Sequence, residues 1–502
     1  MTDFMILHDF IAAAPAEAVA IAAPDRQPLT YAGLSTQIAD IGRALANAGI
    51  KLGDKVAIVL PNGPDMASAF LGVACAAVAA PLNPAYKPDE FRFYMDDLKV
   101  RLLILEEGDQ SPARAVAAEL GIPVLDIKPR AEAGRFDIPG SNGTTQPQRP
   151  APDDAALVLH TSGTTSRPKI VPLSHANLAS SAKNIIATLN LTADDRCLNI
   201  MPLFHIHGLV AGVLSSLAAQ GSVYCAPGFN ALKFFGWMDE AHPSWYTAVP
   251  TMHQAILARA PRNAEIIARN PLRFVRSSSA SLPAPVLLEL EAALKCRVIE
   301  AYSMTESAHQ MTSNQLPPGN RKPGFVGCAA GPEVAVMAPD GRLLGVGEEG
   351  EVVIRGPNVT AGYESNPAAN EQAFAHGWFH TGDQGYMDED RFLKITGRLK
   401  EIINRGGEKI APVEVDEVLM DHPAVQQSVT FAMPHDKLGE DVAAAVVLKE
   451  GAHADERDLQ DFAAKRLAAF KVPRRIVILP EIPKGATGKL QRIGLAQKLG
   501  LA

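Results

Sequence analysis

The stretch HTSGTTSRPK, residues 160–169, places five hydroxyl side chains, one glycine and two cations directly after an apolar run. A strand that ends in such a turn presents backbone N–H groups and hydroxyls to an anion, and Lys169 adds positive charge. The GxxxxGK[ST] spacing is absent, so this is not a Walker loop. The stretch therefore predicts an anion site of another kind.

A second stretch, EAYSMTESAHQ at residues 300–310, puts a threonine and a carboxylate at the end of an apolar run. A carboxylate oxygen is a hard ligand of the kind that Mg²⁺ prefers, and the neighbouring hydroxyl suits a phosphate. Helix N-termini also favour Thr and Glu, so the pair Thr305–Glu306 indicates a phosphate and Mg²⁺ site only when it is taken together with the other stretches.

Two further stretches carry charged groups in glycine-rich turns. Asp383 lies in GWFHTGDQGYMDED, residues 377–390, where a carboxylate is placed to accept both hydroxyls of a ribose, with Arg398 as support. Near the C-terminus, GATGKLQ at residues 485–491 carries Lys489 on a turn that also fails the Walker spacing. The histidines of FHIHG, residues 204–208, lack a nearby third ligand, so a metal site there is not predicted.

Composition narrows the class of protein. The chain has 502 residues, is 47% hydrophobic and 20% charged, and carries a net charge of −8, which favours large cores and gives no general attraction to nucleic acid or anionic membrane. Five scattered cysteines without a CxxC pair favour a reducing compartment. The N-terminus shows no signal-peptide pattern, so we expect a cytoplasmic protein that is a monomer or a homodimer.

The elements that must position these residues alternate between short β-branched runs and alanine-rich stretches. Residues 55–60 precede a helical pattern over 65–79, and residues 101–107 precede another over 111–120. This alternation predicts α/β units with parallel strands. After residue 340 turn signals crowd together around strands and predict a β-rich subregion. The stretch GRLKEIINRGGEKIAPVEVDEVL, residues 397–419, is followed by about 80 residues of short strands and helices that could fold by themselves. We place the domain boundary near Arg398–Lys400.

Taken in order, the four stretches resemble those of the adenylate-forming superfamily, which includes acyl-CoA synthetases, luciferases and peptide-synthetase adenylation domains. The resemblance spans essentially the whole chain. It implies an α/β protein with a large N-terminal domain, residues 1–398, of mixed sheets packed with helices plus a β-barrel-like subregion. A small mobile α+β domain, residues 399–502, would follow. The implied reaction joins a carboxylate to the AMP of ATP and then transfers the acyl group to a thiol, usually that of coenzyme A.

The resemblance also implies roles for individual residues. Thr305 would contact the α-phosphate, Glu306 would hold Mg²⁺, and Lys489 would bridge the attacking carboxylate and the α-phosphate as the catalytic lysine. Lys400 matches the hinge, and Gly406 and Gly407 would line the coenzyme A tunnel after the small domain has rotated. The other implied ATP contacts are, for the phosphates, Thr161, Ser162, Gly163, Thr164, Thr165 and Lys169, and, for adenine and ribose, Ser279, Ala280, Glu300, Ala301, Tyr302, Asp383 and Arg398. The family usually has glycine where this chain has Ser166.

Three polar residues predict a small acid substrate. His207, Ser281 and His309 occupy positions that should face the acyl group, where an apolar acid would leave their donors without partners. A second carboxylate on a very small acid would satisfy them. These segments resemble those of oxalyl-CoA synthetases (oxalate–CoA ligases) most and malonyl-CoA synthetases somewhat less. Malonate or another short acid, transfer to a carrier protein, and a catalytically inactive nucleotide-binding protein stay open as alternatives.

Overall fold

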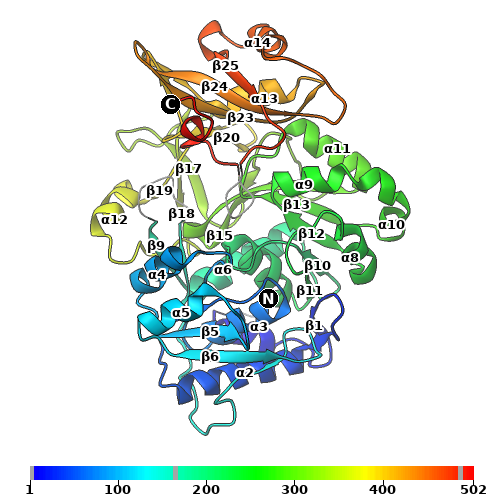
Figure 1. Cartoon of the computed structure of the whole chain (residues 1–502), viewed down its shortest axis with the longest axis vertical. Coiled ribbons are helices and arrows are strands. Elements are labelled where there is room, and N and C mark those ends of the chain that lie inside the picture. The colour runs from blue at the N-terminus through cyan, green and yellow to red at the C-terminus, as the bar shows by residue number, and fades with distance from the viewer. Residues whose placement is uncertain (1–4, 162–167, 484–489) are drawn as a thin grey trace.

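The computed structural model describes residues 5–161, 168–483 and 490–502. Figure 1 shows a large body of helix-covered sheets with a smaller C-terminal unit at one end. The first sheet has seven strands, and its apolar runs 55–60 and 101–107 contain two parallel neighbours, as predicted. In spatial order the strands are β7 (Phe136–Asp137), β6 (Val124–Pro129), β5 (Leu102–Glu106), β3 (Lys55–Ile58), β4 (Val78–Pro81), β8 (Ala155–His160) and β9 (Ile170–Ser174).

The second sheet has nine strands and supplies most of the candidate site. Its central strands run parallel, and the chain turns back antiparallel after β14, so that His309 lies opposite Met304. In spatial order the strands are β16 (Cys328–Ala329), β15 (His309–Ser313), β14 (Arg297–Met304), β13 (Phe274–Ser278), β12 (Trp245–Ala248), β10 (Arg196–Asn199), β11 (Ser222–Cys225), β1 (Val19–Ala22) and β2 (Leu29–Thr30).

Helices fill the space between the two sheets and cover their outer faces. Helix α3 (Pro64–Ala74) contacts β4 and β8 of the first sheet and β11 of the second, and α6 (His175–Leu189) contacts β9 and β15. Because α3 is enclosed on all sides, every residue from Met66 to Ala74 is buried, which accounts for its alanine-rich composition. The outer helices are α4 (Pro88–Asp97) and α5 (Pro112–Glu119) on the first sheet, and α8 (Phe234–Ala241), α9 (Pro250–Leu257) and α11 (Ala284–Leu294) on the second.

The β-rich subregion after residue 340 is an antiparallel sheet of four strands. Its order is β17 (Glu333–Met337), β18 (Gly350–Arg355), β19 (Phe379–Met387) and β20 (Leu393–Arg398). Asp383 on β19 and Arg398 on β20 are register partners, so the pairing of the hairpin itself places them side by side.

The C-terminal unit is α+β. Helices α13 (Pro412–Met420) and α14 (Glu456–Ala464) share a buried core with its sheet, and α15 (Leu495–Lys498) shares a second one. The change of sheet falls just after Arg398. The domain boundary between residues 398 and 399 and the mobility of the unit stay predictions. Its strands are β22 (Glu408–Ile410), β21 (Ile403–Arg405), β24 (Gly439–Leu448), β23 (Val425–His435) and β25 (Arg475–Ile478).

Candidate active site

The anion stretch connects β8 to β9, and its two ends are bonded to each other. The Thr161 N–H donates to the Lys169 carbonyl at 2.9 Å, and the Lys169 N–H donates to the Thr161 hydroxyl at 3.0 Å. The base of the connection is therefore closed, as an anion-binding turn requires. Ser162, Gly163, Thr164 and Thr165 lie outside the described residues.

A lysine, a tyrosine and a buried glutamate form a chain of contacts beside this stretch. The Lys169 ammonium lies 4.3 Å from the ring centroid of Tyr363, whose hydroxyl donates to Glu306 Oε1 at 2.9 Å. Burial raises the pKa of Glu306, while Tyr363, Arg398 and Lys169 oppose that rise. Burial also lowers the pKa of Lys169, and the charge of Lys400 lowers it further.

Thr305 and Glu306 directly follow β14, as the sequence predicted. They begin a short 3-10 turn, Thr305–Ser307, which reverses the chain into β15. Ala308 completes the reversal in the left-handed conformation, with φ of 49°. One buried carboxylate fits Mg²⁺, which is commonly bound by one or two carboxylates together with substrate phosphates, and the nearby Lys169 cation suits those phosphates. The described residues contain no group of three or more side chains suited to hold a metal by themselves.

Asp383 accepts hydrogen bonds from two different sheets. The Tyr302 hydroxyl on β14 donates to its Oδ2, and Arg398 Nε donates to its Oδ1 at 2.8 Å. The charge of Asp383 raises the pKa of Arg398. Asp383 is only 4% exposed, so its carboxylate is held in one orientation. The structure thus brings Asp383 and Arg398, which the resemblance assigned to the ribose, together with Tyr302, which it assigned to the adenine.

The predicted adenine residues surround the turn after β13. Glu300 Oε1 accepts from the Leu282 N–H at 2.9 Å and so ties this turn to β14. The hydroxyl of Ser278, the last residue of β13, donates to the Ala301 carbonyl at 2.8 Å. Ser279 has φ of 72°, and Ala280 is exposed. Burial raises the pKa of Glu300 to about 8, so at neutral pH its carboxyl is largely protonated.

Two of the three residues predicted to face the acid lie against each other. His207 and His309 are fully buried, with ring centroids 4.9 Å apart and an interplanar angle of 30°. His207 begins a π-helical segment, His207–Leu214. Gly208 allows its close approach, because a Cβ there would lie 2.4 Å from the Pro202 carbonyl oxygen. Such segments often occur at functional sites.

Hydroxyl groups flank both nitrogens of His207. Nδ1 lies 3.0 Å from the Ser279 hydroxyl, and Nε2 lies 2.6 Å from the Thr247 hydroxyl on β12. Ser281, by contrast, is exposed, and its contacts among the described residues include neither histidine. The hydroxyl beside His207 thus belongs to Ser279, two residues earlier in the same turn.

Sequence reasoning missed Arg276, which lies on β13 behind the histidine pair. Its Nη1 lies 3.0 Å from His309 Nε2, and its Nη2 donates to Gln310 Oε1 at 3.3 Å. The side chain is completely buried, and burial lowers its pKa to about 9. The sequence signal that could have revealed Arg276 is a cation within an apolar strand that is followed by hydroxyl residues. Tyr363 and Thr247 were missed as well, and neither lies near a recognisable motif.

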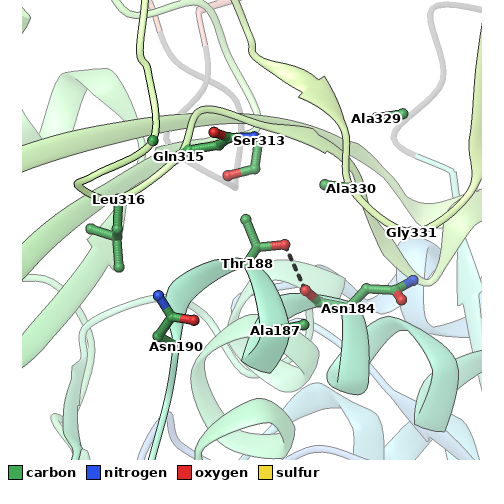
Figure 2. Close-up of a pocket in the computed structure, with 11 residues that line it drawn as sticks. Asn184, Ala187, Thr188, Asn190, Ser313, Gln315, Leu316, Ala329, Ala330 and Gly331 are labelled. Carbon is green, nitrogen blue, oxygen red and sulfur yellow. Dashed lines mark hydrogen bonds between the residues drawn. The ribbon is translucent and has the colours of Figure 1, made fainter.

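Gln310 connects Arg276 to a cavity of about 390 Å³ between α6 and the β15–β16 edge. Its Nε2 donates to the Thr188 hydroxyl at 3.0 Å and to the Ala330 carbonyl at 3.2 Å, and both of those residues line the cavity. Figure 2 shows Thr188 bonded in turn to the Asn184 carbonyl on the same helix. The position of Gln310 is therefore set from two elements.

The C-terminal residues singled out by the sequence occupy turns. Gly406 and Gly407 join β21 to β22 as a two-residue hairpin, with φ of 59° and 99°, and such hairpins favour glycine. Lys400 is exposed on the connection between β20 and β21, and Lys489 lies outside the described residues. Within the described part of the chain, no helix is long and apolar enough to cross a membrane.

Comparisons with known proteins agree with this geometry. The family model of AMP-binding enzymes matches residues 8–364, and that of the AMP-binding enzyme C-terminal domain matches residues 414–489. An oxalate–CoA ligase of Arabidopsis thaliana is 46% identical over 96% of this chain and 97% of its own length. One of Saccharomyces cerevisiae is 39% identical over 95% and 94%. The crystal structure of ATP-bound MatB from Rhodopseudomonas palustris has a TM-score of 0.89 at 29% identity, covering 99% and 98%.

The chain therefore belongs to the AMP-binding enzymes, the adenylate-forming superfamily. Within it, the protein is an AMP-forming acyl-CoA ligase.

Proposed function

We propose that this ligase acts on oxalate. One oxalate carboxylate attacks the α-phosphate of ATP, giving oxalyl-AMP and releasing pyrophosphate. The thiolate of coenzyme A then attacks the oxalyl carbonyl, giving oxalyl-CoA and releasing AMP. The observation that carries the substrate is the buried polar pair His207 and His309, with hydroxyls on both sides of His207 and the cation of Arg276 behind His309. Such a lining suits a second carboxylate and not an apolar acyl chain.

The nucleotide would be held by the residues already described. Lys169 and Thr161 would contact the phosphates, and Asp383 would contact the ribose hydroxyls; the hydrogen bonds that hold Thr161 against Lys169 and Arg398 against Asp383 support these roles. Mg²⁺ bound at Glu306 would neutralise phosphate charge. Tyr363 orients that carboxylate, and Lys169 supplies positive charge beside it.

The C-terminal unit would serve both half-reactions. Lys489 would offset the negative charge that builds up as the carboxylate attacks phosphorus. Rotation at Lys400 would then exchange Lys489 for the Gly406–Gly407 hairpin, whose backbone, without side chains, allows the close passage of the pantetheine arm of coenzyme A. Malonate or another short acid is the second candidate within this class.

A pyrophosphate-release assay over small mono- and dicarboxylic acids, with and without coenzyme A, tests the substrate. Oxalate should have the highest kcat/KM, and hexanoate and cinnamate should be very poor. His207→Ala should lower kcat/KM for oxalate by about 10- to 150-fold, because a hydrogen bond to a charged group contributes about 1.5–3 kcal/mol. The KM for ATP should hardly change.

The matched control is His253→Ala, which removes a second fully buried histidine that bonds Tyr246 at 3.2 Å. Its effect should be the same for every acid. Equal activity of the wild type on oxalate and hexanoate would exclude a small-diacid site and leave the acyl-CoA ligase class standing.

A further inference from the structure

Arg276 is a buried cation that lacks an acidic partner among the described residues. Its hydrogen bonds go to His309 and Gln310, both uncharged acceptors in this geometry. A charge on Cys197 would raise the pKa of Arg276. Buried charges are normally paired or bound to ligands, because removing an unpaired charge from water is unfavourable. A missing negative charge near Arg276 therefore points to an anionic ligand.

The contact with Arg276 determines the state of His309. A guanidinium carries only donors, so Nε2 of His309 must accept with its lone pair, and the ring proton must lie on Nδ1. A second proton on this ring would convert Nε2 into a donor facing a donor and would place two cations 3.0 Å apart. His309 is thus held as the neutral imidazole with an N–H at Nδ1.

The orientation of Arg276 is itself secured from a distance. Gln310 directs its Oε1 to Arg276 because its Nε2 is occupied by the Thr188 hydroxyl on α6 and by the Ala330 carbonyl. The Gln310 carbonyl accepts in addition from Asn358 Nδ2 at 2.9 Å. The guanidinium is consequently held behind His309 in one arrangement.

We propose that Arg276 is the positioning residue that restricts this enzyme to small acids with a second anionic group. This inference rests on the proposed function, since it assumes that the acid lies at the histidine pair. The anionic end of the acid would receive the Nδ1 proton of His309 as a hydrogen bond and would balance the charge of Arg276. Either a carboxylate or a sulfonate would supply that chemistry.

Steady-state kinetics of Arg276→Met and Arg276→Lys test the selection. Arg276→Met should raise the KM for oxalate by about 10- to 150-fold, with a smaller effect on kcat and none on the KM for ATP. The preference for oxalate over butyrate, as a ratio of kcat/KM values, should fall by at least about 10-fold. Arg276→Lys, which keeps a cation, should recover part of both losses. Arg273→Met, three residues earlier and 41% exposed in its pair with Asp195, should leave the preference unchanged.

A second measurement does not depend on which acid is used. In protein labelled with ¹⁵N-histidine, the ring nitrogens of His309, assigned by comparison with His309→Gln, should report a neutral ring protonated at Nδ1. In Arg276→Met the proton should move to Nε2, the tautomer that a free imidazole prefers. A wild-type ring protonated at Nε2, or an unchanged oxalate preference in Arg276→Met, overturns the proposal.

These two readouts separate the proposal from the proposed function. If the wild type activates other acids but not oxalate, the proposed substrate is wrong, and the preference between the best acid with a second anionic group and butyrate then tests Arg276. If Arg276→Met does not fold, the Arg276→Lys kinetics and the wild-type tautomer decide the matter.

Discussion

The ammonium group of Lys169 lies 4.3 Å from the centre of the Tyr363 ring, and the hydroxyl of that ring donates to Glu306. One tyrosine thus fixes the separation of a cation and a carboxylate that come from two different sheets. A Mg²⁺–triphosphate group needs both charges at once, positive for the phosphates and negative for the metal. Tyr363 therefore acts as a spacer between two residues that the sequence pointed to separately.

Replacing Tyr363 with phenylalanine keeps the ring beneath Lys169 and removes the hydrogen bond to Glu306. Because that hydrogen bond opposes the rise in the pKa of Glu306, its loss should raise this pKa further. The acid limb of pyrophosphate release should then move to higher pH, with a fall in kcat of about 3- to 10-fold at neutral pH. Tyr386→Phe is the control, since the Tyr386 hydroxyl has no hydrogen bond among the described residues. If the acid limb of the pH profile stays at the same pH in Tyr363→Phe, the proposed role of the Tyr363 hydroxyl is wrong.

Glu300 should make the protein less stable as pH rises. Burial raises its pKa from the ordinary value of 4.5 to about 8, so between these values the folded chain holds a proton that the unfolded chain has released. The free energy of unfolding should therefore fall with rising pH, by up to about 1.4 kcal/mol per pH unit for this one group.

Glu300→Gln removes this proton while keeping an oxygen that can accept from the Leu282 N–H. Urea unfolding at a series of pH values between about 5 and about 8 measures the difference. The free energy of unfolding of the variant should rise relative to that of the wild type as pH rises. Parallel curves for the two proteins would mean that Glu300 is ionised in the folded state.

Lys489→Ala should separate the two half-reactions. Adenylate formation should be severely impaired, because this lysine would offset charge in the first transition state. Thioester formation from supplied acyl-AMP should remain largely intact, since Lys489 would by then have rotated away. Single-turnover assays of each step measure the split, and equal losses in both steps would argue against two orientations of the C-terminal unit.

Residues within contiguous motifs were accessible from the sequence alone. Thr305 and Glu306 could be placed at the end of a strand because an apolar run stops there, and they directly follow β14. Asp383 and Arg398 could be assigned to one site because a carboxylate between glycines suits a ribose and an arginine can support it, and the two are register partners. The local residue pattern was sufficient in both cases.

Arg276, Thr247 and Tyr363 could not be placed in this way. Arg276 meets His309 across β14, and Thr247 meets His207 from β12, so both contacts depend on the spatial order of strands and on side-chain direction. Neither contact can be predicted from the local periodicity of the sequence. Ser281 shows the reverse error, a residue that was predicted to face the acid because of its type. The chain turns at Ser279, where φ is positive, and Ser281 is exposed.

Arg492 follows Lys489 by three residues and pairs with Glu401 at 3.3 Å and with Asp416 at 2.6 Å. Glu401 adjoins Lys400, so a single guanidinium ties the chain just beyond Lys489, the proposed catalytic lysine, to the proposed hinge and to helix α13. If the C-terminal unit rotates at Lys400 as proposed, these ion pairs would make the segment around Arg492 move together with the hinge. Reversing the charge at Glu401 should uncouple the Arg492 segment from the hinge. The change from the first half-reaction to the second should then be disturbed, while each half-reaction measured alone stays largely intact.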